Sequence, residues 1–149
     1  MGIKILSSNR KAFHEYVITD KLEAGIVLTG TEVKSAREGR INLSDGWVDI
    51  DDQGEAWLRE VQISLYSHGS YMNHEEKRSR KLLLNRAEIT RLAAKIQEKG
   101  LTVVPLQMYF KDDFIKVEVA VAKGKKLHDK RDSAKTKEAG REIARAMKR

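Results

Sequence analysis

Alternation of apolar and polar residues along the chain predicts a protein built mainly from β-strands. Residues 12–29 are rich in β-branched and aromatic types, and an interruption at 21–25 leaves one long or bent strand, or two. The segments GWVDID (46–51) and EAWLREVQI (55–63) alternate well enough to form two further strands. Residues 51–54 would join them as a four-residue hairpin loop.

A second hairpin is predicted near the end of the apolar part of the chain. LTVVPLQMYF (101–110) and FIKVEVAVA (114–122) flank a short polar loop at 111–113. In the second of these strands every other residue from Ile115 is apolar, which is the period of a strand with one buried face. Pro105 has no N–H to donate to a neighbouring strand, so it indicates a bulge or an edge in the first.

Two helices are predicted between the strand blocks. The first begins with Thr31 as its N-cap and ends at Gly39, where a glycine tolerates the left-handed backbone that terminates a helix. The second has a capping box formed by Asn85 and Glu88, a single apolar face, and a stop at Gly100.

These elements indicate a fold that is mainly β with some α. Five to seven strands in hairpins, with two or three helices, suit a small antiparallel β-barrel of the OB type, closed or nearly closed, with an open α+β sandwich as the competing architecture. Residues 1–122 are long enough to bury one core, and residues 123–149, hereafter the tail, are expected to lack structure when free.

Charge is distributed unevenly along the chain. It carries 29 Lys+Arg against 22 Asp+Glu, a net charge of +7. The tail holds eleven basic residues against four acids, which is also a net of +7, so residues 1–122 are balanced. An excess of positive charge confined to one end predicts a polyanionic partner for that end.

Composition disfavours several other classes of protein. The absence of cysteine excludes disulfides and thiolate sites and fits a reducing cytosol. The first residues carry a charge at Lys4 and too short an apolar run for a signal peptide, and no stretch approaches about 18 consecutive apolar residues. We therefore expect a cytoplasmic, soluble monomer without a cofactor.

Four stretches together resemble the SsrA-binding protein family, also called small protein B. They are NRKAFHEY (9–16), LTGTEVKSAREGRINLSDGWV (28–48), RSRKLLLNRAEI (78–89) and GKKLHDKR (124–131). The resemblance covers nearly the whole chain in the right order. It implies an OB-type barrel that binds the tRNA-like domain of transfer-messenger RNA and delivers it to stalled ribosomes, together with an elongation factor and alanine-charged transfer-messenger RNA.

The resemblance and the residue types together predict an RNA-binding face on residues 1–122, hereafter the body. On residue types alone, an ordinary solvated segment fits the basic N-terminal residues better than an RNA contact does, and an acid at position 32 fits the first turn of a helix. The resemblance favours an RNA-side role for both, in which cations hold phosphates while amides and aromatic groups give specificity. The predicted residues are Asn9, Arg10, Lys11, His14, Glu32, Lys34, Arg37, Arg40 and Asn42.

A second basic cluster precedes the apolar run KLLL. Lys77, Arg78, Arg80 and Lys81 place four positive charges within five residues. A charge run is usually a solvated surface, but this density also fits phosphate contact, and we include Arg80 and Lys81 among the predicted RNA contacts.

The tail is predicted to engage the ribosome near the small-subunit decoding site and in the messenger channel. His128 offers a ring that stacks on an exposed base, and apolar residues at a spacing of four form a narrow stripe beyond it. Such a segment is too charged to hold a helix alone and is expected to fold against RNA. The predicted residues are Gly124, Lys125, Lys126, His128, Asp129, Lys130, Arg131, Ile143 and Met147.

Two alternatives remain open at the level of sequence. One is a general OB-type RNA chaperone or ribosome-associated protein without preference for transfer-messenger RNA. The other is a metal-dependent nuclease, which His68, His74, the neighbouring acids at 75–76 and the His-Asp pair at 128–129 would suggest. The chain has no HExxH, GxSxG or phosphate-binding glycine loop, so we expect no enzymatic activity.

Overall fold

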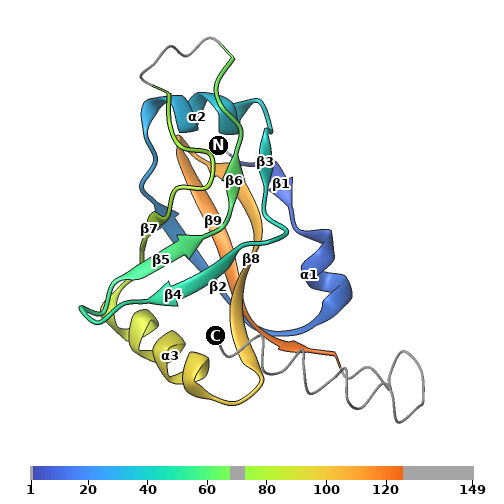
Figure 1. The fold of residues 1–149 in the computed structure, drawn as a ribbon, viewed down its shortest axis with the longest axis vertical. Coiled ribbons are helices and arrows are strands. Elements are labelled where there is room, and N and C mark those ends of the chain that lie inside the picture. Colours follow the sequence, from blue (N-terminus) through green and yellow to red (C-terminus); the bar gives the residue numbers. More distant parts are fainter. Residues whose placement is uncertain (1, 68–72, 126–149) are drawn as a thin grey trace.

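A computed structural model describes residues 2–67 and 73–125 (Figure 1). The elements of the described residues, in chain order, are β1 (Ile3–Ser8), α1 (Arg10–Glu15), β2 (Tyr16–Ile26), α2 (Gly30–Arg37), β3 (Ile41–Asn42), β4 (Trp47–Ile50), β5 (Ala56–Arg59), β6 (Gln62–Ile63), β7 (Arg80–Leu83), α3 (Arg86–Gln97), β8 (Leu101–Lys111) and β9 (Phe114–Gly124). The expectation of a mainly β protein with few helices is confirmed.

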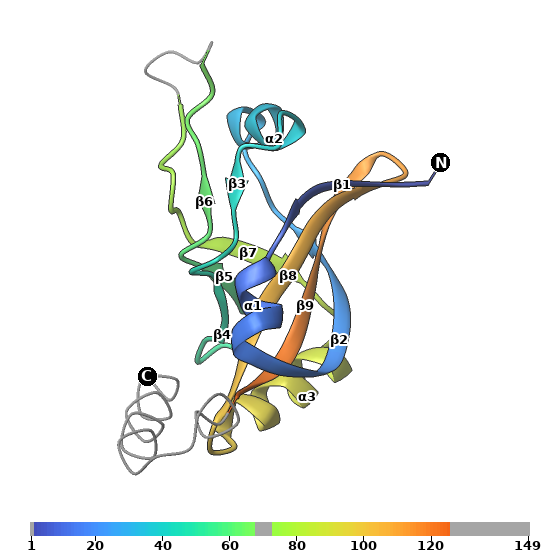
Figure 2. The same cartoon turned by 90° about the vertical axis from the view of Figure 1, so that its right-hand side faces the viewer.

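The strands form one large antiparallel sheet and one small one. The large sheet has seven strands in the order β1-β8-β9-β2-β7-β5-β4, and β3 pairs with β6 in the small sheet. The large sheet curls so that Val48 of β4 and Leu58 of β5 share a core with Val103 of β8 and Val119 of β9. Leu92 of α3 is buried in the same core, so α3 closes one end of it, as Figures 1 and 2 show.

The sequence predicted a closed or nearly closed barrel, and the sheet is not closed, because the two edge strands, β1 and β4, do not pair with each other in the described residues. In the part of β8 that precedes its pairing with β1, the Asn9 backbone N–H donates to Leu106 O at 2.7 Å. The Asn9 side-chain amide donates to Pro105 O at 2.8 Å and to Leu43 O at 3.2 Å. Asn9 therefore bridges the seam that a hydrogen-bonded strand pair would have closed.

Helix α1 covers the outer face of the sheet beside this seam. Ala12 packs there with Leu106, Ala120 and Ala122 in a small second core. The prediction that residues 12–15 belong to a strand was wrong, because they lie in α1. The Asn9 side chain accepts a hydrogen bond from the Ala12 N–H and so begins a helix instead.

Helix α2 begins two residues earlier than predicted. Its N-cap is Thr29 and not Thr31, and Thr29 exchanges hydrogen bonds with Glu32 in a capping box. The predicted end of the helix at Gly39 is confirmed by its φ of +74°.

The best-patterned elements agree with their predictions. Helix α3 has the predicted capping box between Asn85 and Glu88. Both predicted hairpins form, and the register between β8 and β9 shifts after Pro105, as expected for a bulge there. The predicted strand 55–63 is divided into β5 and β6, because Glu60 between them has a φ of 61°.

Two short strands, β1 and β3, were not predicted, and the last strand is longer than expected. The predicted body ended at residue 122, whereas β9 continues to Gly124, which pairs with Tyr16. The backbone N–H of Lys125 then donates to Glu15 O at 3.1 Å. The rest of the tail, residues 126–149, lies outside the described residues.

We predict that Asn9→Ala lowers the free energy of unfolding by about 2–3 kcal/mol. The substitution removes the N-cap of α1 and leaves the buried carbonyl groups of Leu43 and Pro105 without their donor. Urea unfolding of the full chain measures the change. Asn42→Ala, at an exposed asparagine with only local bonds to Ser44, is the control and should lose less than about 1 kcal/mol. Equal losses in the two variants would contradict this role for Asn9.

Candidate RNA interface

The centre of the candidate site is a buried carboxylate held by two arginines. Glu32 and Arg80 are both fully buried, and Arg80 Nε donates to Glu32 Oε2 at 2.6 Å. Arg78 donates to the same carboxylate, with Nη2 at 2.6 Å from Oε1. The remaining Arg80 donors reach Val61 O at 2.7 Å and Glu76 O at 3.0 Å. This network, hereafter the Glu32 clamp, fastens α2 to β7.

The Glu32 clamp keeps its carboxylate ionised. Burial acts to raise the pKa of Glu32, but hydrogen bonds from Arg78, the Thr29 N–H and Arg80, with the charge of Arg80, together lower this pKa below its ordinary value. Burial lowers the pKa of the Arg80 guanidinium, and Glu32 opposes that effect. Glu32 and Arg80 are therefore both charged in the folded protein, and each stabilises the charge of the other.

A histidine joins α2 to the strand beneath it. His74 is buried, with Nδ1 2.9 Å from Thr31 Oγ1 and Nε2 2.9 Å from Ile63 O. Because a carbonyl oxygen only accepts, Nε2 carries a proton and donates it there. Both ring nitrogens are thus occupied, so His74 is not placed to bind a metal as the nuclease alternative requires. No group of three or more metal-binding side chains occurs among the described residues.

Exposed cations lie on the elements that these buried contacts hold. Helix α2, β3, β1 and α1 follow one another along one side of the molecule, which faces the viewer in Figure 2. Ser7 of β1 donates to Ile41 O of β3 at 3.1 Å, which joins the two halves. We call this surface the α1–α2 face. Its exposed predicted residues are Arg10, Lys11, His14, Lys34, Arg37, Arg40 and Asn42.

Aromatic rings orient the two cations of α2. The ammonium of Lys34 lies 5.5 Å from the centroid of the Tyr66 ring, and the guanidinium of Arg37 lies 5.3 Å from that of Phe110. Neither cation makes an ion pair with a described residue. Stacking on a ring restricts a side chain without cancelling its charge, so both cations keep their charge for a ligand.

The two cations of α1 differ in their ion pairs. Arg10 makes no ion pair with a described residue, whereas Lys11 lies 3.6 Å from Asp45 and 3.9 Å from Glu15. These contacts are between exposed groups and are therefore weak. Arg10 and Lys11 both remain accessible to an anion.

Three predicted RNA contacts are buried instead. Asn9 is 3% exposed, and Glu32 and Arg80 are 0% exposed, and the polar groups of all three are engaged within the protein. Their place in the structure supports a positioning role and not direct contact. Lys81 is half-buried and forms an ion pair at 2.7 Å with Glu55, the residue before β5, away from the α1–α2 face. Arg78 joins the Glu32 clamp, so the second basic cluster is largely paired.

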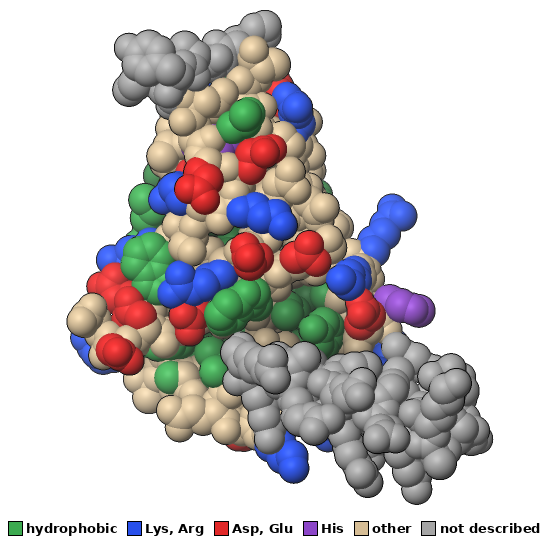
Figure 3. All heavy atoms as spheres, viewed as in Figure 1, with side chains coloured by type: hydrophobic (Ala, Val, Ile, Leu, Met, Phe, Trp, Pro, Cys, Tyr) green, Lys and Arg blue, Asp and Glu red, His purple; other side chains and the backbone are tan. Residues whose placement is uncertain are grey.

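The surface over β4 and β5 offers less to a polyanion. Figure 3 shows lysine, arginine and acidic side chains interspersed over β4 and β5, so neither sign of charge is continuous there. Of the predicted tail residues, the structure describes only Gly124 and Lys125, and the remainder lie outside the described residues. No described helix is long and apolar enough to cross a membrane.

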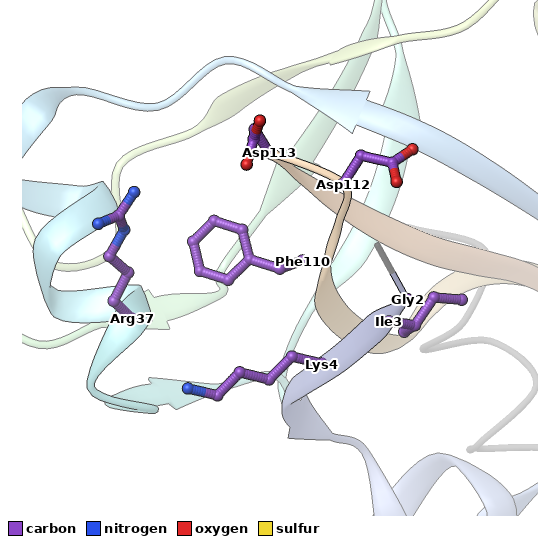
Figure 4. Close-up of a pocket in the computed structure, with 7 residues that line it drawn as sticks. All are labelled: Gly2, Ile3, Lys4, Arg37, Phe110, Asp112 and Asp113. Atoms are coloured by element: carbon purple, nitrogen blue, oxygen red, sulfur yellow. The ribbon is translucent and has the colours of Figure 1, made fainter.

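Sequence reasoning missed Lys4 and Phe110, which share a cleft with Arg37 (Figure 4). Lys4 is the cross-strand partner of Phe110 in the pairing of β1 with β8. The apolar and polar residues of IKIL were the sequence signal that β1 is a strand.

The comparisons with known proteins agree on one family. A family model described as SmpB protein matches residues 6–149. An SsrA-binding protein of Saccharopolyspora erythraea is 55% identical over 148 residues, which cover 99% of this chain and 93% of that protein. One of Chlamydia trachomatis serovar A is 54% identical over 149 residues, which cover 100% of this chain and 98% of that protein.

A solved structure is also similar to the fold described above. It comes from work described as "tmRNA-SmpB: a journey to the center of the bacterial ribosome". Its TM-score with this chain is 0.72, at 40% sequence identity, and the match covers 95% of this chain and 96% of that one.

We predict that Glu32→Gln lowers the free energy of unfolding by about 3 kcal/mol or more. Glutamine keeps the shape of the side chain but leaves Arg80 as a buried charge without a counter-ion. Urea unfolding at neutral pH measures the loss. Glu38→Gln, at the exposed C-cap of the same helix, is the matched control and should change stability by less than about 0.5 kcal/mol.

The difference in unfolding free energy between wild type and Glu32→Gln should also depend on pH. The folded pKa of Glu32 is lowered, so its contribution is complete above the unfolded glutamate pKa of about 4.3 and is lost as pH falls through the folded value. The difference in stability between wild type and Glu32→Gln should therefore shrink on acidification below that pH. A difference that stays constant down to the folded pKa would show that the charge of Glu32 is not the cause.

Proposed function

The chain belongs to the SmpB family, and from this premise we propose that it binds transfer-messenger RNA and acts with it on the bacterial ribosome in trans-translation. The observation that carries the proposal is the α1–α2 face. Arg10, Lys34 and Arg37, exposed cations without an ion pair to a described residue, lie there on two helices that buried polar contacts hold in place.

The α1–α2 face receives the tRNA-like domain of the RNA. Arg10, Lys34 and Arg37 hold phosphates, which sets the position of the RNA on the protein. His14 and Asn42, both exposed, supply a ring and an amide that interact with bases or 2′-hydroxyl groups. Asn9, Glu32 and Arg80 act indirectly, because they fix the positions of α1 and α2.

The tail engages the ribosome in this proposal. Its net charge of +7 suits an RNA-walled channel, and His128 adds a ring that stacks on a base. The tail leaves the body beside α1, where Lys125 is bound to Glu15. The charged transfer-messenger RNA would bring elongation factor Tu with it, and the protein itself acts as a cytoplasmic monomeric adaptor without catalysis.

Specificity separates this function from that of a general RNA chaperone. The protein should bind the isolated tRNA-like domain more tightly than unrelated RNA of equal length at the same salt concentration, because non-specific attraction depends mainly on charge. Equal affinity for both RNAs would favour the chaperone.

We predict that Lys34→Ala and Arg37→Ala each weaken binding to the tRNA-like domain by about 1–3 kcal/mol without unfolding the protein. Both side chains are exposed, so stability should hardly change. A fluorescence titration at low salt measures the affinity. Lys99→Ala removes a charge that is also exposed, from the opposite end of the body between α3 and β8, and is the control (Figure 1). If neither α2 variant loses affinity, the RNA lies on another face.

We predict that removal of Lys130–Arg149 abolishes tagging on stalled ribosomes but largely preserves recognition of the isolated tRNA-like domain. The remaining loss of affinity should be modest and should shrink as salt screens the tail charges. His128→Ala should reduce tagging alone, because the variant keeps every charge and loses only a stacking surface. Full-rate tagging by the truncated chain would contradict the proposed role of the tail, as would loss of specific binding at moderate salt.

A further inference from the structure

A cleft of about 560 Å³ opens where β1, the last turn of α2 and the turn between β8 and β9 meet (Figure 4). Ile3 and Lys4 of β1 line one side, and Arg37 of α2 lies opposite. Phe110 stands between them, and Asp113 lies above its ring in Figure 4. The cleft therefore joins an aromatic ring, an exposed aliphatic residue, cations and a carboxylate.

The backbone fixes these side chains relative to one another. Lys4 and Phe110 are paired across β1 and β8, so both project from the same face of the sheet. Arg37 is held over the Phe110 ring at 5.3 Å. Asp112 adopts a φ of 56° in the two-residue turn that follows Lys111, which presents Asp113 beside the ring and directs the Asp112 carboxylate away from it.

The cleft contains charges of both signs that do not pair with each other. Among the described residues, none of Lys4, Arg37, Asp112 and Asp113 forms an ion pair, although both signs are present. A site for phosphate alone would not place a carboxylate beside its cations, since the carboxylate repels the anion. The ligand must therefore carry an anionic group and, a short distance away, hydrogen-bond donors.

Resting on the proposed RNA-binding function, we propose that this cleft binds one unpaired guanosine nucleotide of the RNA. Arg37 and Lys4 hold its phosphate. Ile3, which is 58% exposed, and Phe110 give the ribose and base an apolar contact.

The Asp113 carboxylate selects the base. Guanine carries two adjacent N–H donors on its Watson–Crick edge, N1–H and the N2 amino group, and a single carboxylate accepts both. Adenine and cytosine each offer an amino group next to an acceptor nitrogen, which a carboxylate repels. Because base pairing occupies the same edge, only an unpaired guanine fits.

Nucleotide titrations followed by NMR test this assignment in the full chain. Isotope-labelled protein is titrated with the 5′-monophosphates of guanosine, inosine and adenosine, and with inorganic phosphate. We expect the guanosine nucleotide to shift the amide signals of Lys4, Phe110 and Asp113. Inosine lacks only the N2 amino group, so its affinity should be lower by roughly tenfold.

Two variants separate base selection from phosphate binding. Asp113→Asn should remove the preference for guanosine over inosine while phosphate still shifts the Lys4 signal. Phe110→Leu should weaken the binding of all three nucleotides, because the Arg37 guanidinium loses the ring on which it stacks. Asp52→Asn, at an exposed aspartate in the turn between β4 and β5, is the matched control and should change nothing.

Equal binding of guanosine, inosine and adenosine nucleotides, or shifts confined to residues outside the cleft, would overturn the assignment. Binding of the tRNA-like domain by the wild-type protein is measured in parallel. If the protein binds the tRNA-like domain specifically but the cleft does not bind the guanosine nucleotide, the proposed nucleotide site is wrong and the proposed function stands. If the tRNA-like domain is bound no better than unrelated RNA, the proposed function itself fails.

Discussion

The buried ion pair between Glu32 and Arg80 is the interaction on which the proposed RNA face depends. It joins the first turn of α2 to β7, which is far from it in the sequence. Arg78 donates a further hydrogen bond to the same carboxylate. An apolar contact of the same size would hold the helix as strongly, but it would leave rotation about the helix axis less restricted. The directed hydrogen bonds fix that rotation, and with it the side of α2 on which Lys34 and Arg37 emerge.

Asn9 has the corresponding role for α1. One amide caps the helix and spans the unpaired seam between β8 and the segment before β4, where the sheet remains open. The body thus divides its polar residues into two groups. Buried ones satisfy one another and set the geometry, and exposed cations on α1 and α2 stay without strong internal partners. An RNA-binding face needs both groups. The exposed cations bind the phosphates, and the buried contacts hold those cations at a fixed spacing that matches the spacing of the phosphates.

Local signals predicted those parts of the fold that local interactions decide. The capping box of Asn85 and Glu88 and the two hairpins depend on residues close in sequence, and they form as expected. The roles of Asn9, Glu32 and Arg80 depend on partners between 34 and 96 positions away, so residue type alone gave no indication that they are buried. The cleft around Phe110 was missed for the same reason, since the register of β1 on β8 brings Lys4 to it. Full closure of the predicted barrel does not occur in the described residues, where the edge strands β1 and β4 stay unpaired and Asn9 donates to Leu43 O and Pro105 O instead.

Lysine footprinting of the full chain tests most directly that the α1–α2 face holds the RNA. Reductive methylation with and without the tRNA-like domain, followed by mass spectrometry, reports the accessibility of each lysine in a single experiment. The account predicts that the RNA protects Lys4, Lys11 and Lys34, which lie along β1, α1 and α2. Lys95 and Lys99, at the end of α3, should react at unchanged rates. Protection of Lys95 and Lys99, with Lys4, Lys11 and Lys34 still reactive, would contradict it.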